Sequence, residues 1–305
     1  MLMCSPEIVG LDRAHHRPVA GDSDLADSIK LLARAHQTAI WDRTRQVLRL
    51  RSTLREFFPA ALEAFADLSA SDTLTLLARA PSPASAATLT RSQVSAALRA
   101  ARRHHVEEKV TVLLGVLRAP ALRQPPKLDN AYATLVLGQV RVIAALNAQI
   151  EQLAQVVAEH FDRHPAAETY LSQPGLGVVL AARVMGEFGD DAVRFADARA
   201  RKNYSGQSPI TRASGKKSVV LARYATNRRL GAALHLQAYS ALTASPGARA
   251  YYDTIRARGT GHHAALRQLA NRLVGILHGC LKKGTCYDED KAWQHHRADA
   301  ENAAA

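Results

Sequence analysis

The chain has 305 residues, and 40 Lys and Arg against 27 Asp and Glu give it a formal net charge of +13. With a sequence pI of about 10.0, a polyanion is the expected partner, nucleic acid before an anionic membrane surface. No stretch approaches the roughly 18 uninterrupted apolar residues of a membrane-spanning helix, which excludes an integral membrane protein. The length exceeds that of one average domain and predicts two compact units.

The composition favours a helical protein without a metal framework. The start of the chain, from Met1 to Glu7, lacks the basic and apolar regions of a secretory signal, so we expect a cytoplasmic protein. Cys4, Cys280 and Cys286 show no CxxC pairing, and the 13 histidines show no zinc-binding spacing, so no metal site is predicted. Only 5% of the residues are aromatic while Ala, Leu and Arg abound, which predicts a mainly α fold, a helical bundle.

Residues 1–21 are predicted to be an irregular lead-in to a helical middle region over 22–164. Asp22 and Ser23 offer an N-cap, and apolar residues at three- and four-residue steps then predict a long helix that Pro59 ends. Several shorter helices between proline-rich breakers form a compact insert over 62–122. The cations of the long helix either follow a phosphate backbone or form a solvated face; they are Lys30, Arg34, Arg43, Arg45, Arg49, Arg51 and Arg55.

A near-heptad apolar stripe predicts a coiled-coil-like stalk over 127–162, and with it a long helix pair. Gln139 and Asn147 interrupt or flank this seam. Polar residues there suit an antiparallel partner helix within the chain or the same helix of a second copy, and the sequence leaves both open. Separately from this choice, a homo-oligomer is expected.

After Pro165 the composition changes to small residues, glycines and cations. We predict a small C-terminal helical domain over 165–285 and a loose tail over 286–305. The turn from Pro174 to Gly177 lies between short predicted helices at 167–171 and 178–188. This pattern is typical of a helix-hairpin-helix, in which glycine lets backbone amides face a DNA phosphate, so Gly175 and Gly177 are candidate contacts. An ordinary corner between two helices has the same pattern.

Further helices are predicted at 196–204, 226–244, 248–258 and 262–282. Between Ala198 and Tyr252 the chain has no Asp or Glu but many cations. Because like charges repel and destabilise an isolated fold, contact with phosphates explains this imbalance better than solubility does. The predicted nucleic-acid contacts are Arg201, Lys202, Arg212, Lys216, Lys217, Arg223, Asn227, Arg228 and Arg229.

A predicted loop over 204–217, rich in hydroxyls, glycine and cations, contains a candidate nucleophile. Ser214 follows Arg212 and precedes Gly215 and Lys216. Cations near a serine lower the cost of forming an alkoxide and offset charge on a pentavalent phosphoryl transition state. The alternative is a serine that binds phosphate and does no chemistry.

The motifs PGLG, ARARKNYSGQSPITRASGKK and NRRLGAALHLQAYSAL lie between Tyr170 and Lys283, and together with residues 16–57 they resemble a known family. The resemblance is to insertion-sequence transposases of the IS-one-ten type, the DEDD transposases also described as bridge-RNA-guided recombinases. It implies a DNA transposase or recombinase that cuts and exchanges strands, with DNA and a structured guide RNA as partners and no membrane. It also implies that Ser214 becomes covalently attached to cut DNA.

Members of that family also carry an N-terminal RuvC-like domain whose Asp and Glu residues hold divalent metal. Asp12 and the pair Asp24 and Asp27 imitate parts of it, but only eleven residues separate Asp12 from Asp24, which leaves no room for its sheet. We therefore predict a truncated, by itself inactive transposase that binds no cofactor, with Mg²⁺ expected only alongside a RuvC-like half. The alternatives are a non-catalytic DNA- or RNA-binding remnant or regulator, and a structural coiled-coil adaptor whose affinity for nucleic acid would be insensitive to salt.

Overall fold

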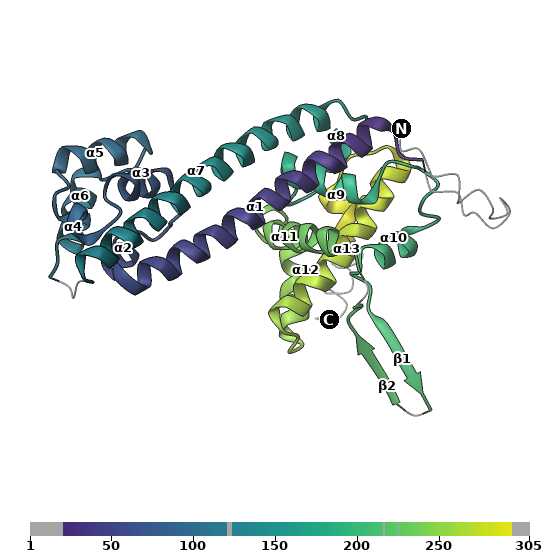
Figure 1. The fold of residues 1–305 in the computed structure, drawn as a ribbon. Helices are drawn as coiled ribbons and strands as arrows, with labels where there is room; N and C mark the ends of the chain where they lie inside the picture. Colours follow the sequence, from purple (N-terminus) through teal and green to yellow (C-terminus); the bar gives the residue numbers. More distant parts are fainter. Residues whose placement is uncertain (1–20, 121–123, 216, 225, 295–305) are drawn as a thin grey trace, which may run out of the picture. The chain divides into compact units, whose positions relative to one another are not determined.

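The computed structural model describes residues 21–120, 124–215, 217–224 and 226–294 (Figure 1). Over these residues the fold is mainly α, as predicted, with one two-stranded antiparallel sheet. The chain divides into two compact units: the stalk unit, residues 34–156, and the C-terminal unit, residues 1–33 with 157–305. Helices α1, Asp24–Phe57, and α7, Pro126–Asp162, each contribute to both units. The units thus divide the chain inside these helices, whereas the predicted boundaries lie at 21 and 164.

Within the stalk unit, α1 and α7 lie side by side and run antiparallel (Figure 1). Gln139 Nε2 donates to Thr53 Oγ1 at 3.1 Å, and Arg43 Nη1 donates to Asn147 Oδ1 at 3.1 Å. Asn147 Nδ2 in turn donates to the Ser69 carbonyl at 2.8 Å. Both polar residues of the predicted seam therefore form hydrogen bonds inside this chain, although the Gln139 Oε1 has no partner among the described residues.

Short helices complete the stalk unit between α1 and α7: α2 Pro59–Ala64, α3 Ser71–Arg79, α4 Pro83–Ala87, α5 Arg91–Ala100 and α6 Val106–Leu117. Two of them begin with capping boxes, Ser82 with Ser85 for α4 and Thr90 with Gln93 for α5. Their apolar faces meet those of α1 and α7 in one core, whose fully buried members include Leu50, Leu54, Phe58, Leu77, Val94, Val110, Val136 and Ile143.

By length and composition, helix α7 could cross a membrane. It is the one helix among the described residues that meets these two criteria. One such helix is weak evidence, because core helices of soluble proteins pass the same test. Val136, Val140 and Ile143 on one side are buried in the stalk unit, whereas Leu135 and Val142 on another are exposed. One side of α7 is therefore packed in the core of the stalk unit, and a second apolar stripe on the helix is exposed.

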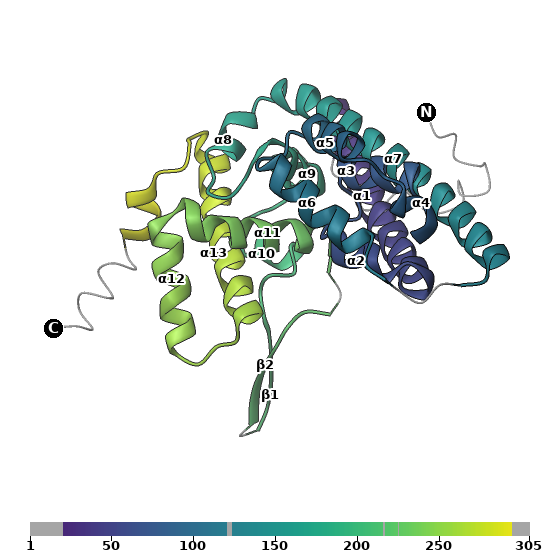
Figure 2. The same ribbon diagram turned by 90° about the vertical axis from the view of Figure 1, so that its left-hand side faces the viewer.

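The C-terminal unit is built around α13, His262–Lys283 (Figure 2). Its Leu266, Leu269, Leu273 and Leu277 are fully buried, and α10, α11 and α12 pack around it. The other elements are α8 Ala167–Leu171, α9 Val178–Phe188, α10 Ala198–Tyr204, β1 Ile210–Ser214, β2 Lys217–Leu221, α11 Arg228–Ala244 and α12 Pro246–Ala257.

The prediction of a loose tail is wrong for residues 286–294. Trp293 is fully buried, and its Nε1 donates to the Tyr287 hydroxyl at 2.8 Å. The indole fits against α12 because Gly247 has no side chain; a Cβ there would lie 2.2 Å from the ring. A buried Trp contributes heavily to stability, so this segment belongs to the core. Residues 295–305 lie outside the described residues.

Candidate nucleic-acid interface

The segment predicted as a loop around Ser214 is a β-hairpin, which corrects that prediction. Strands β1 and β2 pair antiparallel with Ser214 opposite Lys217, and every residue of both strands is exposed. The hairpin extends away from the helices of the C-terminal unit (Figures 1 and 2). Gly215 has φ +55° in its turn, a conformation that favours glycine. The β-branched residues in both strands were a signal for this hairpin that the sequence interpretation missed.

One face of the hairpin brings the candidate nucleophile together with two cations. Residues two apart in a strand share a face, as do directly paired residues of neighbouring strands. Arg212, Ser214 and its partner Lys217 therefore lie on one face, while Ser218, paired with Ala213, lies on the other. Lys216 lies outside the described residues.

Ser214 is solvent-exposed, and no hydrogen bond to its hydroxyl is formed by any residue that the structure describes. The hydroxyl is thus free to approach a ligand. A serine hydroxyl is a weak nucleophile at neutral pH without a general base or metal to activate it. Within the described part of the chain the hairpin supplies cations for a phosphate but no base for Ser214.

Two hydrogen bonds fix the base of the hairpin to the helices, and a close approach of two loop residues joins its two ends. Ser208 Oγ donates to Asn271 Oδ1 on α13 at 3.3 Å, and Arg223 Nη2 donates to Asn203 Oδ1 on α10 at 3.1 Å. Gly206, with φ +74°, lies so close to Thr226 that a Cβ would be 2.4 Å from its methyl group. Arg223 therefore has a structural partner in addition to its predicted contact with nucleic acid.

At the start of α11, one predicted contact residue caps the helix and another is an exposed cation. The Asn227 side-chain oxygen accepts from the backbone amides of the first turn at 3.1 Å, and its Nδ2 donates to the buried Glu187 carboxylate at 2.7 Å. Burial, and next the charge of Arg229, hold the pKa of the Arg183 guanidinium below its ordinary value. Glu187 and Arg183 were not identified from the sequence as neighbours of this helix start, because they lie on α9, about 40 residues earlier in the chain. Arg228 is exposed at this helix start.

On helix α10, the side chain of one predicted nucleic-acid contact, Arg201, points into the core. Arg201 is 8% exposed, and its guanidinium lies 5.0 Å from the centre of the Phe188 ring and 4.7 Å from that of Phe195. Arg201 is therefore not part of the exposed surface of α10, and its predicted contact with nucleic acid stays a prediction. Lys202 is half-buried beside α13, and burial lowers its pKa. Arg249 forms an ion pair with Asp253 within α12. Because Arg201 is buried, the cations of the acid-free stretch do not all share one exposed surface.

The turn from Pro174 to Gly177 packs against α11. Gly175 has φ +78°, and a Cβ on it would lie 2.4 Å from the Gln237 carbonyl oxygen and 2.7 Å from the Ala241 amide nitrogen. This glycine is thus required for the close approach of two backbones. Gly177 is exposed at the start of α9 with open space around it. The helix-hairpin-helix contact with phosphate remains a prediction.

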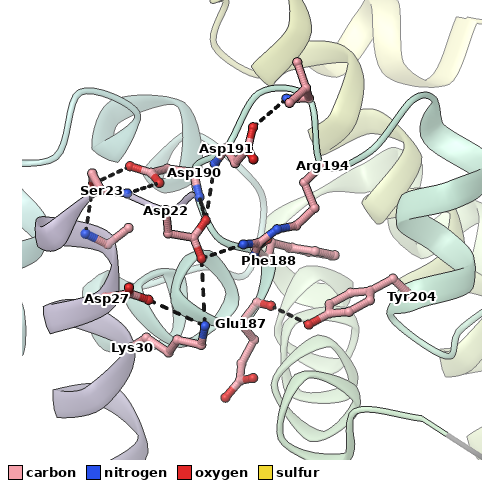
Figure 3. Close-up of polar contacts among 12 residues, drawn as sticks. Asp22, Ser23, Asp27, Lys30, Glu187, Phe188, Asp190, Asp191, Arg194 and Tyr204 are labelled. Carbon is pink, nitrogen blue, oxygen red and sulfur yellow. Dashed lines mark hydrogen bonds and ion pairs between the residues drawn. The ribbon is translucent and has the colours of Figure 1, made fainter. Parts of the chain in front are cut away.

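Carboxylates near the start of α1 are engaged in protein contacts (Figure 3). Asp22 Oδ2 accepts from Arg194 Nη2 at 2.7 Å, and its Oδ1 accepts from the Asp190 amide at 3.1 Å. Ser23 Oγ donates to Asp190 Oδ2 at 2.5 Å. Burial acts to raise the pKa of Asp190, but hydrogen bonds from Ser23 and His164 outweigh it, and the pKa lies below its ordinary value. The described residues contain no group of three or more His, Cys, Asp or Glu that could hold a metal.

Comparison with known proteins places this geometry in a family. The family model described as Transposase IS116/IS110/IS902 family matches residues 167–253, which include the hairpin. The "Mini-circle putative transposase for IS117" of Streptomyces coelicolor is 43% identical over 291 residues, which are 94% of this chain and 70% of that protein. The "Insertion element IS900 uncharacterized 42 kDa protein" of Mycobacterium paratuberculosis is 28% identical, over 89% of this chain and 68% of its own length. Because the chain is 43% identical to the IS117 protein over 70% of that protein's length, and the family model matches the segment with the hairpin, the chain belongs to the IS116/IS110/IS902 transposase family.

Proposed function

We propose that this transposase-family chain binds DNA and carries the serine nucleophile for strand cleavage and exchange by an insertion sequence. The observation that supports this role is the exposed hairpin face, where Ser214 lies between Arg212 and Lys217. Cations beside an accessible hydroxyl offset the negative charge that develops during attack on a phosphodiester, and activation of the hydroxyl has to come from a base or metal in addition. The curated relative that is 43% identical is itself named a putative transposase.

In the proposed reaction, Ser214 Oγ forms a bond to a DNA phosphorus while the bond from phosphorus to the 3′ oxygen breaks. The serine gives up its proton and the departing 3′ oxygen takes one up, so a phosphoserine link to DNA replaces one phosphodiester. Arg212 and Lys217 offset the negative charge on the phosphoryl oxygens. Attack of a DNA hydroxyl on this link in the reverse direction joins the exchanged strand.

The test is a covalent-adduct assay with transposon-end DNA, carried out with any separately supplied metal-binding half of a transposase. Ser214→Ala is expected to remove the adduct, a loss of at least about 10³-fold, while DNA affinity stays unchanged. The matched control is Ser218→Ala, an exposed serine on the opposite face of the same hairpin. An adduct that survives Ser214→Ala, or disappears equally in Ser218→Ala, contradicts the assignment.

We further propose that catalysis needs carboxylate-held Mg²⁺ supplied from outside the described residues, because these contain no cluster suited to it. Bound Mg²⁺ would polarise the scissile phosphate. The described part of the chain alone is then expected to bind DNA and cleave little or none of it. Vigorous strand exchange by the chain without an added partner would contradict this.

The proposed interface extends from the hairpin to the helix starts around it. Its residues are Gly177, Lys202, Arg212, Lys217, Arg223, Asn227, Arg228 and Arg229. Arg201 and Gly175 are left out because Arg201 is buried and Gly175 packs against α11. Cations and helix starts bind phosphate in DNA and RNA alike, so a structured guide RNA is a second proposed ligand. Competition between RNA and DNA for the chain tests it.

The alternative function is a non-catalytic DNA- or RNA-binding remnant or regulator of a transposon. The exposed cations support it as well as they support the enzyme. The adduct assay separates the two, since a remnant binds DNA but forms no covalent link in any complementation mixture.

We also propose a cytoplasmic homo-oligomer that pairs through the exposed stripe of α7. In an antiparallel pair the large residues of this stripe would face its small ones; the stripe comprises Leu128, Ala131, Leu135, Gly138, Val142 and Ala145. Leu135→Lys is expected to weaken self-association at least about tenfold in sedimentation experiments. The control Leu48→Lys changes an equally exposed leucine on α1. A monomeric wild-type protein would contradict the proposal.

A further inference from the structure

A second candidate site lies in the C-terminal unit, away from the hairpin. It is a cavity of about 800 Å³ between the start of α1, the segments before α8 and after α9, and the end of α13. Leu25, Met185 and Phe195 form apolar parts of its wall, while Arg201 and His278 bring positive charge to it. A cavity of this size with a few polar groups is typical of a small-molecule site.

Arg201 is the most unusual residue of the cavity. It is 8% exposed, and its Nε and Nη1 have no hydrogen-bond partner among the described residues. No carboxylate in the described part of the chain forms an ion pair with it either. The groups that face it are the Phe188 and Phe195 rings and the hydroxyl of Tyr170, which carries no charge at neutral pH. A buried charge without a counter-charge is costly, and burial indeed lowers the pKa of this guanidinium. An anion in the cavity would offset that cost.

The residues around Arg201 add to the excess of positive charge. His278 Nδ1 is also buried without a partner in the described residues. Burial, followed by the charges of Arg201 and Lys282, holds the pKa of His278 below its ordinary value. Lys282 lines the same cavity and is exposed to solvent.

The acidic residues of the cavity wall are already engaged elsewhere. Asp190 accepts hydrogen bonds from Ser23 and lies 3.3 Å from His164 Nε2. Asp191 Oδ1 accepts from the Val193 amide at 2.8 Å. Neither carboxylate forms an ion pair with Arg201, and the lining has more Arg and Lys than Asp and Glu.

We propose that this cavity binds a phosphate group, held by Arg201 with Lys282 and His278, and that the apolar wall accommodates an attached nucleoside. A guanidinium donates several hydrogen bonds to phosphate oxygens in a fixed geometry. The Nε and Nη1 of Arg201 have no such partner among the described residues. The phosphate has two conceivable sources, the end of a nucleic-acid strand or a free nucleotide. The site is separate from Ser214 and does not depend on the reaction proposed for it.

The test measures binding to the full chain by calorimetry and by the thermal midpoint of unfolding. The probes are inorganic phosphate, adenosine monophosphate, and short single strands with and without a 5′ phosphate. We expect saturable phosphate binding that Arg201→Gln weakens at least about tenfold and Lys282→Gln about three- to fivefold. The matched control is Lys283→Gln, the next residue on α13, which lines a different surface of the unit.

Several outcomes would overturn the proposal: no saturable binding up to about 50 mM phosphate, or equal weakening by Lys282→Gln and Lys283→Gln. The lysine pair decides the matter if Arg201→Gln fails to fold. A preference for the 5′-phosphorylated strand supports the site and assigns it to strand ends, whereas equal binding of the mononucleotide supports it and assigns it to free nucleotides. Ser214→Ala is expected to bind phosphate as the wild type does, so failure of either proposal can be told from failure of the other.

Discussion

Two parts of the same acid-free stretch place their cations in opposite environments. On the hairpin, Arg212 and Lys217 are exposed. On α10, only a few residues earlier in the chain, Arg201 is buried between Phe188 and Phe195. The net charge of a segment therefore predicts the kind of partner but not which cation meets it.

The difference has a physical cause in how each part is stabilised. A two-stranded hairpin with no helix packed over it gains little from apolar burial and is marginally stable by itself. Helix α10 packs on α13 in the core of the unit, so its inward side chain is buried whatever its charge. Stability should thus depend on the packed helices and turns, and ligand affinity on the hairpin.

The largest expected effect is on stability and concerns the turn that packs against α11. Gly175→Ala should lower the free energy of unfolding by about 3 kcal/mol or more, because a Cβ would overlap the α11 backbone at a positive φ. Urea denaturation measures it. Gly177→Ala, two residues on with open space around it, should change stability by less than about 1 kcal/mol. Equal effects of the two substitutions would show that the turn does not pack on α11 as described.

A smaller effect is expected on DNA affinity when the exposed cations of the hairpin are changed. The double variant Arg212→Gln with Lys217→Gln should weaken DNA binding about tenfold and reduce the slope of log affinity against log salt by about 2, since two phosphate contacts are lost. Its urea denaturation curve should match the wild type, because both side chains are exposed. Lys283→Gln with Lys291→Gln removes the same charge elsewhere in the unit. If this control weakens binding equally, the hairpin has no special role.

The smallest expected effect concerns the link between α1 and the segment after α9. Ser23→Ala removes a hydrogen bond to Asp190 and the cap on Ala26, at a cost of about 1 kcal/mol at pH 7. Because the pKa of Asp190 is lowered in the folded protein, the ionised carboxyl stabilises the fold above about pH 4, and this contribution is lost as the pH falls through the folded pKa. The difference between variant and wild type should therefore shrink between about pH 5 and pH 3 in urea denaturation. A difference that stays constant over this range would rule out the Asp190 contribution.

Much of the local structure could be predicted from the chain alone. Helices α8 and α9 have their predicted bounds, and the predicted stalk differs from α7 by one residue at its start. Periodic apolar residues and proline stops are local signals, so they suffice for helices of this kind. The hairpin was missed because its exposed strands lack a buried alternating face, which is the usual mark of a strand.

The amino-acid sequence by itself determined the helical class, the excess of positive charge near Ser214 and the resemblance to insertion-sequence transposases, because these depend on composition, spacing and motifs. Tertiary structure alone decided that Arg212, Ser214 and Lys217 share a face while Arg201 turns inward. It also decided that Gly175 serves backbone packing and that Trp293 joins the core. Burial depends on residues distant in the chain that meet only in the folded protein, and no local pattern records which of them will meet.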